Sequence, residues 1–511
     1  MNEKTRTEYS ILNILTGLGG YFLNTILGFI CRIFFVRYLT ADYLGINGLF
    51  SNLLMVLSLA ELGVGNAVVF ALYKPLAEHD EKKIASLVDF YGKAYKIIGI
   101  VVAIVGLLFL PFLNVIVPTQ PNIKESLYVL YIINLFNTAS TYFFSYKSSL
   151  IIAAQQNYIV SGLNYLITIL QSVFQIIVLI FTKNYLMYLL IQTIGTFVFN
   201  FSVSKIADYK FPYIQNKNIE PLDNEEKKTL FSNVRDLMIY KISGLLVNST
   251  DNILITFFKG LSVTGIASNY TLLVSTLNSL LSQIFNGLTA SVGNHNAIES
   301  DENKYKMFSF LNFMNFWIFG WASLGIVFCS SDIVKICFGK DYVLNISIPV
   351  VMALNFFTTG MMNAVWTYKH TMGLFHYGRF LQIITGILNI IFSIVLGNVY
   401  GLFGILFATF LARFFTNLWY DPYAVYKYGF NKSAFEYIKK YSYYLFVLLV
   451  SFIACSICLK FIYVDTIIDL FLKMIACSVI ANFVFVLFFY KSENFKKITE
   501  ILKNILKIKT V

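Results

Sequence analysis

Charge is scarce in this chain. Asp, Glu, Lys and Arg make up 13% of the 511 residues, whereas 57% are hydrophobic and the mean hydropathy is +0.68. A soluble chain of this length could not bury that much apolar surface. The composition therefore excludes a soluble protein and indicates that almost the whole chain lies in a membrane.

Residues that carry chemistry are also few. There is no Gly-rich phosphate loop, and the Cys455-x-x-Cys458 pair lies in an apolar span without a second ligand pair. The six cysteines predict no disulfide framework, and we expect no metal, cofactor or catalytic residue. The four histidines all fall in predicted loops, and the outer loops are short, so a membrane-bound glycan polymerase or glycosyltransferase is disfavoured.

What the chain does contain is a repeated pattern of apolar spans. A span of about 20 apolar residues matches the hydrocarbon core of a bilayer, and uniformly apolar rather than alternating spans favour helices. The fourteen predicted spans are 11–36, 44–72, 97–117, 127–146, 158–181, 185–204, 237–258, 263–289, 307–329, 343–366, 380–397, 400–420, 441–459 and 474–490.

The distribution of basic residues predicts the orientation. If the N-terminus is cytoplasmic, 28 of the 39 Lys and Arg residues fall in inner segments, eight in outer segments and three inside spans. The positive-inside rule then predicts cytoplasmic N- and C-termini. The net charge of +12 needs no nucleic acid, because basic loops face anionic lipid headgroups. We expect no cleavable signal peptide, because the first span is too long for one.

The chain also carries signs of a duplication. Three short matches recur at a nearly constant separation along the chain and at the same place in the order of spans. They are Gly45-Ile46 with Gly265-Ile266, Asp80-Glu81-x-Lys83 with Asp301-Glu302-x-Lys304, and Ser145-Tyr146-Lys147 with Thr367-Tyr368-Lys369. We therefore predict an all-α integral membrane protein with two parallel six-helix lobes around a central cavity. The predicted parts are a lobe (1–206), a cytoplasmic linker (207–236), a second lobe (237–430), and two extra helices with a basic tail (431–511).

One stretch carries a family resemblance. Residues 34–99 include FFVRYLTADYLGINGLFSNLL and LAELGVGNAVVFALYKPLAEHDEKKIASLVDFYGKAYKIIG. This stretch resembles the N-terminal lobe of Wzx-type polysaccharide flippases, of the multidrug/oligosaccharidyl-lipid/polysaccharide exporter superfamily. The resemblance implies translocation of undecaprenyl-diphosphate-linked oligosaccharides across the bacterial cytoplasmic membrane for O-antigen, capsule or another exopolysaccharide. The alternative is a drug or metabolite cation antiporter of the same superfamily, although such exporters usually have twelve spans.

Cations inside or beside the spans are the candidates for binding a diphosphate. A diphosphate entering a low-dielectric cavity needs positive charge, and the forked guanidinium of Arg binds two oxygens at once. The candidates are Arg32, Arg37, Lys241 and Arg413. Snorkelling to the headgroups is the alternative interpretation, and it is favoured for Arg37 and Lys241 near span ends.

Two carboxylates also lie inside predicted spans. Glu61 and Asp251 are candidates for coupling transport to a proton or sodium ion, because an acid in hydrocarbon must pair, protonate or bind a cation. A structural ion pair or a capped helix break is the alternative. At the C-terminus, Phe495, Ile498, Leu502 and Ile505 recur at helical spacing among lysines, which predicts a basic amphipathic helix on the inner leaflet.

Overall fold

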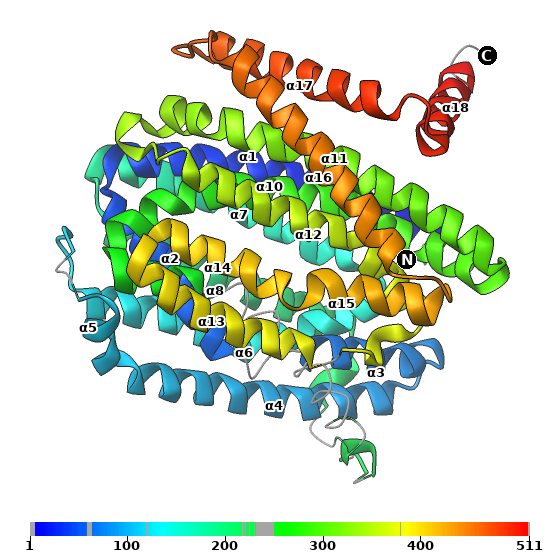
Figure 1. Cartoon of the computed structure of the whole chain (residues 1–511). Helices are drawn as coiled ribbons and strands as arrows, with labels where there is room; N and C mark the ends of the chain where they lie inside the picture. The colour runs from blue at the N-terminus through cyan, green and yellow to red at the C-terminus, as the bar shows by residue number, and fades with distance from the viewer. Residues whose placement is uncertain are drawn as a thin grey trace. The chain divides into compact units, whose positions relative to one another are not determined.

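The computed structural model describes residues 6–58, 64–118, 121–216, 219, 221–223, 225–228, 230, 250–378 and 380–508. These residues form helices joined by short loops, and none of them is in a strand. Figure 1 shows the helices as long rods. The predicted all-α fold is therefore confirmed.

The chain divides into two compact units, 1–265 and 266–511. The helices of the first unit are α1 (Arg6–Tyr38), α2 (Ala41–Leu57), α3 (Val64–Ala77), α4 (Glu81–Leu108), α5 (Leu113–Ile116), α6 (Leu127–Ala153), α7 (Asn157–Thr182) and α8 (Tyr185–Lys210). Helix α10 (Asp251–Ile298) crosses the boundary. Those of the second unit are α11 (Asp301–Phe338), α12 (Ser347–Thr371), α13 (Leu381–Tyr400), α14 (Leu402–Phe414), α15 (Asn417–Ala424), α16 (Phe435–Leu459), α17 (Ile467–Phe489) and α18 (Glu493–Ile508).

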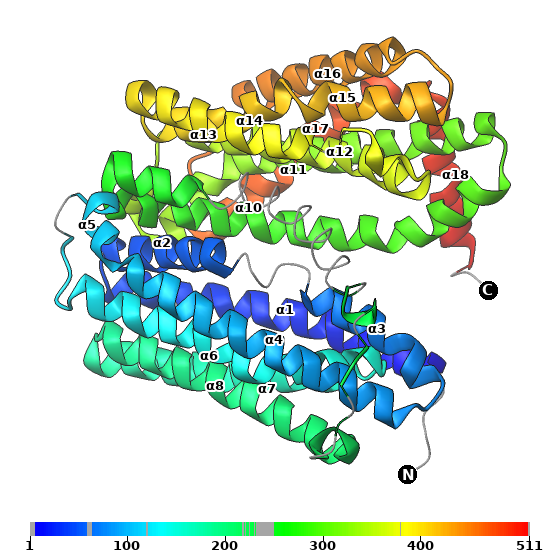
Figure 2. The same cartoon turned by 90° about the horizontal axis from the view of Figure 1, so that it is seen from below.

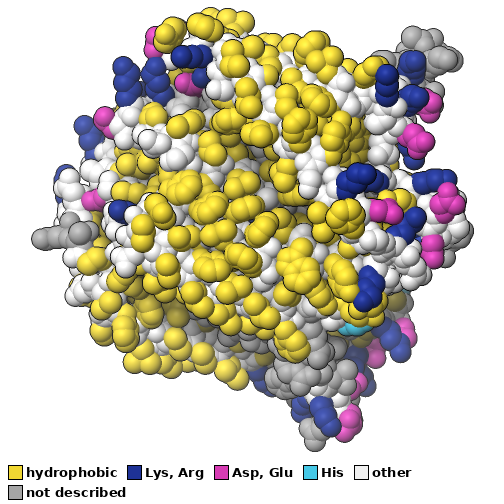
Figure 3. Space-filling view, in the orientation of Figure 1, with side chains coloured by type: hydrophobic (Ala, Val, Ile, Leu, Met, Phe, Trp, Pro, Cys, Tyr) yellow, Lys and Arg dark blue, Asp and Glu magenta, His cyan; other side chains and the backbone are white. Residues whose placement is uncertain are grey.

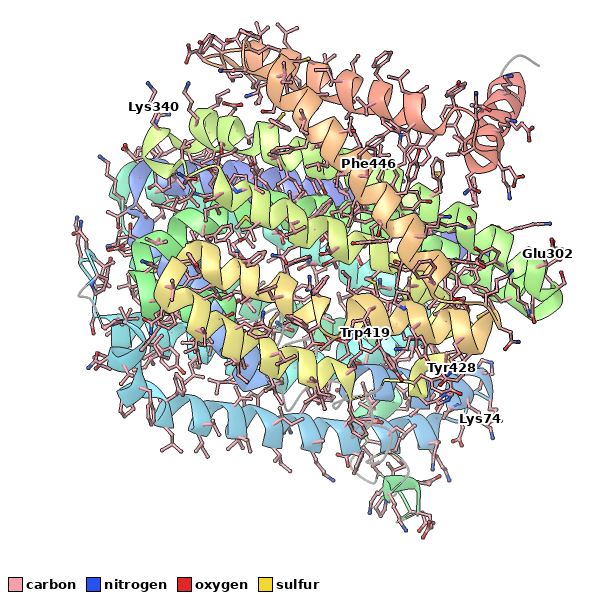
Figure 4. All side chains as sticks on the ribbon, in the orientation of Figure 1. Lys74, Glu302, Lys340, Trp419, Tyr428 and Phe446 are labelled. Atoms are coloured by element: carbon pink, nitrogen blue, oxygen red, sulfur yellow. The ribbon has the colours of Figure 1, made fainter. Side chains whose placement is uncertain are left out.

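The lengths and compositions of these helices suit a membrane. In the described part of the chain, eleven helices are long and apolar enough to cross a bilayer, and α2 is a shorter apolar helix. Figure 3 shows apolar side chains over the middle of the helices, with charged side chains gathered where helices end. Figure 4 labels Glu302 and Lys340 at opposite ends of α11. The chain is a multi-pass membrane protein.

Several span boundaries differ from the prediction. The apolar run 44–72 is not one helix, because α2 ends at Leu57 and α3 begins at Val64. Helix α4 begins at Glu81, well before the predicted 97, because the Asp80 side chain caps it by accepting a hydrogen bond from the Lys83 N–H at 2.9 Å. The predicted span 237–258 lies mostly outside the described residues. Helix α10 bends at Gly260, whose φ of 80° is open to glycine without strain.

In the first unit, α1 packs along α7, and α6 lies between α4 and α8 (Figure 2). The ring of Phe50 on α2 meets that of Tyr131 on α6 edge to face at 5.2 Å. A loop before α6 clasps the start of α2: the Asn122 N–H donates to the Asp42 carboxylate at 2.6 Å, and the Tyr43 hydroxyl donates to Glu125. The clasp fixes where the chain turns from α1 into α2.

In the second unit, the C-terminal helices pack onto α11. The buried Phe316 stacks on Tyr444 of α16 at 4.5 Å and contacts Phe485 of α17 at 5.0 Å. Trp317 stacks on Phe495 of α18 at 5.5 Å. The helix predicted in the tail is confirmed as α18, and half-buried Phe495 lies on its packed side.

Candidate functional site

The basic candidates of the first unit lie on α1. Arg32 is half-buried and close enough to Tyr188 of α8 for an electrostatic interaction, whereas Arg37 is exposed in the last turn of the helix. Snorkelling fits the exposed position of Arg37. Arg32 instead places a cation among half-buried side chains of α1 and α8.

The acidic candidates are described only in part. Asp251 is the first residue of α10 and is half-buried, one residue after Thr250. Glu61 and Lys241 lie outside the described residues. Asp251 therefore sits at a helix start, where a carboxylate is stabilised by the helix dipole.

Arg413 in the second unit lies against a polar part of α12. The guanidinium, in the last turn of α14, is half-buried and donates from Nη1 to the Thr359 hydroxyl at 2.5 Å. One turn before Thr359, the Asn355 amide donates to the Leu406 carbonyl of α14 at 2.8 Å. These two hydrogen bonds connect α12 to α14 and hold the Arg413 side chain against α12.

A fully buried polar seam joins α13 to the segment 409–417. The Thr385 and Thr416 hydroxyls are 2.7 Å apart, and the Asn389 amide donates to the Thr409 hydroxyl at 2.8 Å. Ser393 continues the same face of α13 and is also fully buried. None of these residues is among the candidates predicted from the sequence, although Thr385, Asn389 and Ser393 recur at i, i+4 and i+8 within an apolar helix, a pattern that predicts one polar face.

Two ion pairs, one half-buried and one more deeply buried, explain one of the sequence repeats. In the first unit, Lys147 of α6 pairs with Asp208 of α8 at 2.6 Å. In the second, Lys369 of α12 pairs with Asp421 of α15 at 2.5 Å, and the Trp366 indole donates to the same carboxylate at 3.1 Å. The repeat aligns Lys147 with Lys369. Each of these lysines forms an ion pair with an aspartate of a later helix in its own unit.

Another repeat is equivalent only in part. Asp80 is the N-cap of α4, but its sequence match Asp301 lies one residue inside α11, where Ser300 is the N-cap. The Ser300 hydroxyl accepts from the Asn303 N–H at 3.4 Å. Ser300 therefore occupies in α11 the N-cap position that Asp80 occupies in α4. The sequence repeat instead aligns Asp80 with Asp301, the next residue.

Two of the basic candidates that the structure describes, Arg32 and Arg413, are cations near hydroxyl groups. In the described residues, no group of three or more His, Cys, Asp or Glu side chains is arranged to hold a metal ion. The guanidinium groups of Arg32 and Arg413 and the surrounding hydroxyls offer positive charge and hydrogen-bond donors among apolar helices. Guanidinium groups in general pair with anionic oxygen groups such as phosphates.

Comparison with known proteins gives a likeness in three dimensions. No family model and no curated protein matches the chain. A solved structure of the lipid II flippase MurJ, in an inward closed conformation, matches with a TM-score of 0.65 at 15% identity, over 93% of this chain and 99% of that one. The chain therefore shares the fold of that structure.

Two multidrug transporters support that conclusion about the fold. An inward-facing MATE family transporter of the MOP superfamily matches with a TM-score of 0.55 at 13% identity, over 78% of this chain and 93% of its own. A point mutant of the Vibrio cholerae MATE transporter VcmN matches with a TM-score of 0.52 at 12% identity, over 84% of this chain and 99% of its own.

Proposed function

We propose that this chain is a flippase that moves undecaprenyl-diphosphate-linked oligosaccharides across the bacterial cytoplasmic membrane for polysaccharide synthesis. In this proposal the lobes 1–206 and 237–430 rock about a central cavity, and both termini and the linker 207–236 are cytoplasmic. The final polymer is O-antigen, capsule or another exopolysaccharide.

The extent of the likeness to MurJ carries the proposal. Residues 435–511, with the helices α16, α17 and α18, make up about 15% of the chain. A match over 93% of the chain must include part of this segment, whereas the MATE matches leave enough of the chain uncovered to omit it. The sequence resemblance of residues 34–99 to polysaccharide flippases points to the same class of lipid-linked substrate.

In this proposal the intramembrane cations neutralise the diphosphate. Arg32 and Arg413 bind it during translocation, and Arg37 and Lys241 assist near the ends of the spans. The half-buried position of Arg32 and the hydrogen bond from Arg413 to Thr359 support roles inside the protein rather than at the headgroups. Asp251 and Glu61 couple transport to a proton or sodium ion.

The second candidate is a small-molecule or drug cation antiporter. It is favoured by the two MATE matches, which reach TM-scores of 0.55 and 0.52. The two functions require opposite charge at the site, because a cationic drug needs carboxylates where a diphosphate needs guanidinium groups.

Reconstitution separates the two candidates. The full chain is placed in liposomes with a fluorescent undecaprenyl-diphosphate oligosaccharide, and the fraction of the label that an impermeant quencher reaches is followed in time. We expect equilibration of label between the leaflets with the unmodified protein and slower equilibration with Arg413→Ala. Lys183→Ala, which removes an exposed cation after α7, is the matched control. Efflux of a cationic dye without movement of the lipid would refute the flippase and establish the antiporter.

A further inference from the structure

A cluster of lysines lies at one end of the second unit, where α11, α16 and α18 begin. Its centre is Tyr305, in the second turn of α11, near the end that Glu302 marks in Figure 4. We call Tyr305, Ser309, Lys432 and Lys440 the Tyr305 site. Its residues come from α11, from α16 and from the loop before α16.

Two ammonium groups share the aromatic ring of this site. The Lys432 Nζ lies 4.6 Å and the Lys440 Nζ 5.0 Å from the Tyr305 ring centroid. Both distances are within the range of a cation–π contact. Lys440 also donates to the Tyr305 hydroxyl at 3.1 Å and to the Ser309 hydroxyl at 3.2 Å. The two positive charges are therefore held beside one ring.

The backbone fixes the position of Lys432. A π-helical turn at residues 425–429 follows α15, and Asn431 then adopts a φ of 53°. Asn is one of the few residues that tolerate this left-handed conformation. The N–H of Lys432 donates to the Tyr426 carbonyl at 2.9 Å, which closes the loop and brings the lysine over Tyr305.

The site has more positive than negative charge. Glu436 accepts a hydrogen bond from the Tyr305 hydroxyl at 2.8 Å and interacts electrostatically with Lys440, and Glu302 interacts electrostatically with Lys432. In the described part of the chain, neither Lys432 nor Lys440 forms an ion pair, although Lys306 on the same helix as Tyr305 pairs with Glu302 at 2.9 Å. Both site lysines are half-buried. The two half-buried ammonium groups repel each other, and an anion in addition to these carboxylates would reduce that repulsion.

Helix α18 adds further donors at the edge of the site. The Asn494 amide lies 3.4 Å from the Ser309 hydroxyl. The Lys497 Nζ lies 4.8 Å from the Phe310 ring centroid and has no ion-pair partner among the described residues. The site thus offers ammonium, hydroxyl and amide donors from three stretches that are distant in sequence, namely the start of α11, residues 432–440 and the start of α18.

We propose that the Tyr305 site binds the phosphate of an anionic phospholipid, with Lys497 beside it. The ends of α11 and α16 are the ends of membrane-spanning helices, which is the depth at which lipid headgroups lie. A tetrahedral phosphate accepts several hydrogen bonds at once and fits donors that converge from more than one side. This site is separate from Arg413 and does not depend on the transported substrate.

Native mass spectrometry of the full chain in neutral detergent tests the site. The protein is mixed with phosphatidylglycerol or phosphatidylcholine of the same acyl chains, and the bound fraction is compared. We expect phosphatidylglycerol to bind preferentially, and K432Q/K440Q to lower its affinity on the order of tenfold. K432R/K440R keeps the charges and should retain most of the binding. K93Q is the matched control, since it removes a lysine of α4 that is already paired with Asp89.

Each other result counts against the proposal. Equal phosphatidylglycerol binding by K432Q/K440Q and the unmodified protein overturns the site. An equal loss in K93Q overturns it as well, because general surface charge would then explain the binding. Should the double variant fail to fold, K432Q and K440Q are measured singly, with the same expectation at a smaller loss. Thermal stabilisation by inorganic phosphate, without preference between the two lipids, overturns the lipid and leaves free phosphate as the ligand.

Discussion

Gly45 of α2 and Gly265 of α10 pack reciprocally against each other's helix. A Cβ atom at Gly45 would lie 2.0 Å from the carbonyl oxygen of Leu261, and one at Gly265 would lie 2.0 Å from that of Ala41. Leu261 lies one turn before Gly265, and Ala41 lies one turn before Gly45. The two helices therefore make the same contact with each other in both directions. The Gly-Ile repeat in the sequence is therefore explained by a close crossing that no larger residue fits.

This crossing predicts that Gly45→Ala and Gly265→Ala are both destabilising. Either methyl group would overlap backbone atoms, so the helices must move apart, at a cost of about 1–3 kcal/mol for an overpacked site. We expect each variant to melt at a lower temperature than the unmodified protein in the same detergent. Gly28→Ala is the control, because nothing lies within 4 Å of a Cβ there. Unchanged melting of both crossing variants would contradict the close packing.

The ion pair between Lys369 and Asp421 gives a second prediction. Asp421→Asn leaves the Lys369 ammonium without its counter-charge in a site where the two side chains are 11% and 2% exposed. Removing one partner of a buried pair costs about 3–5 kcal/mol. The loss should appear as a lower unfolding midpoint, and Lys369→Met combined with Asp421→Asn should recover part of it.

The control is an exposed pair of similar geometry. Lys93 and Asp89 are 2.7 Å apart on the surface of α4, with side chains 71% and 35% exposed. Such pairs contribute about 0.2–1 kcal/mol, so Asp89→Asn should change the midpoint little. A loss as large as that of Asp421→Asn would show that removing the charge, not its burial, decides the outcome.

The sequence predicted the helices well and their contacts poorly. Long apolar runs identify spans such as α7 and α17, because hydrocarbon requires about twenty apolar residues whatever the neighbours are. The break between α2 and α3 was foreseen only as an alternative explanation of Glu61, because the run 44–72 is apolar enough to be taken as one span. The sequence also showed Lys147 and Lys369 as a repeat. Their partners Asp208 and Asp421 are separated by fewer residues than the two lysines are, so the separation that relates the lysines does not relate the aspartates.

The same limit applies to the candidate site. Arg413 was identifiable because any charge inside an apolar span stands out. Thr359, its hydrogen-bond partner, did not, because threonine is common in membrane helices and its role depends on which helix faces it. The Tyr305 site joins segments that are distant in sequence, and only the packing of α16 on α11 reveals it.

The contacts of α18 predict its role. Phe495 stacks on Trp317, and Asn494 contacts Ser309, so α18 packs against the first half of α11. We expect deletion of residues 493–511 to lower the amount of folded protein in the membrane more than the transport per molecule. Phe495→Ala should reproduce part of that loss, whereas Lys503→Ala, at an exposed position, should not. Lost translocation at an unchanged protein level would instead assign α18 a direct role in transport.

Orientation is open to labelling. With cytoplasmic termini, Asn216 lies on the cytoplasmic side and Asp341, after α11, on the outer side; both are exposed. We expect an impermeant thiol reagent to label Asp341→Cys in intact cells and Asn216→Cys only after permeabilisation. The unmodified chain gives the background from its own six cysteines. Labelling of Asn216→Cys in intact cells would reverse the orientation.

The arginines give the last prediction. If Arg32 and Arg413 neutralise a diphosphate, Arg32→Ala and Arg413→Ala should abolish surface glycan while the protein remains in the membrane. A charge at mid-bilayer costs about 2.5–3.5 kcal/mol on insertion scales, so a cation without a role there would be costly to keep. Arg413→Lys should restore activity in part if charge alone suffices, and poorly if the forked geometry matters. Thr359→Val removes the hydroxyl that positions Arg413 and should lower the rate less than Arg413→Ala does. Surface glycan is measured per amount of membrane protein, with Lys183→Ala as control, and normal glycan in both Ala variants would leave the two charges with a structural role only.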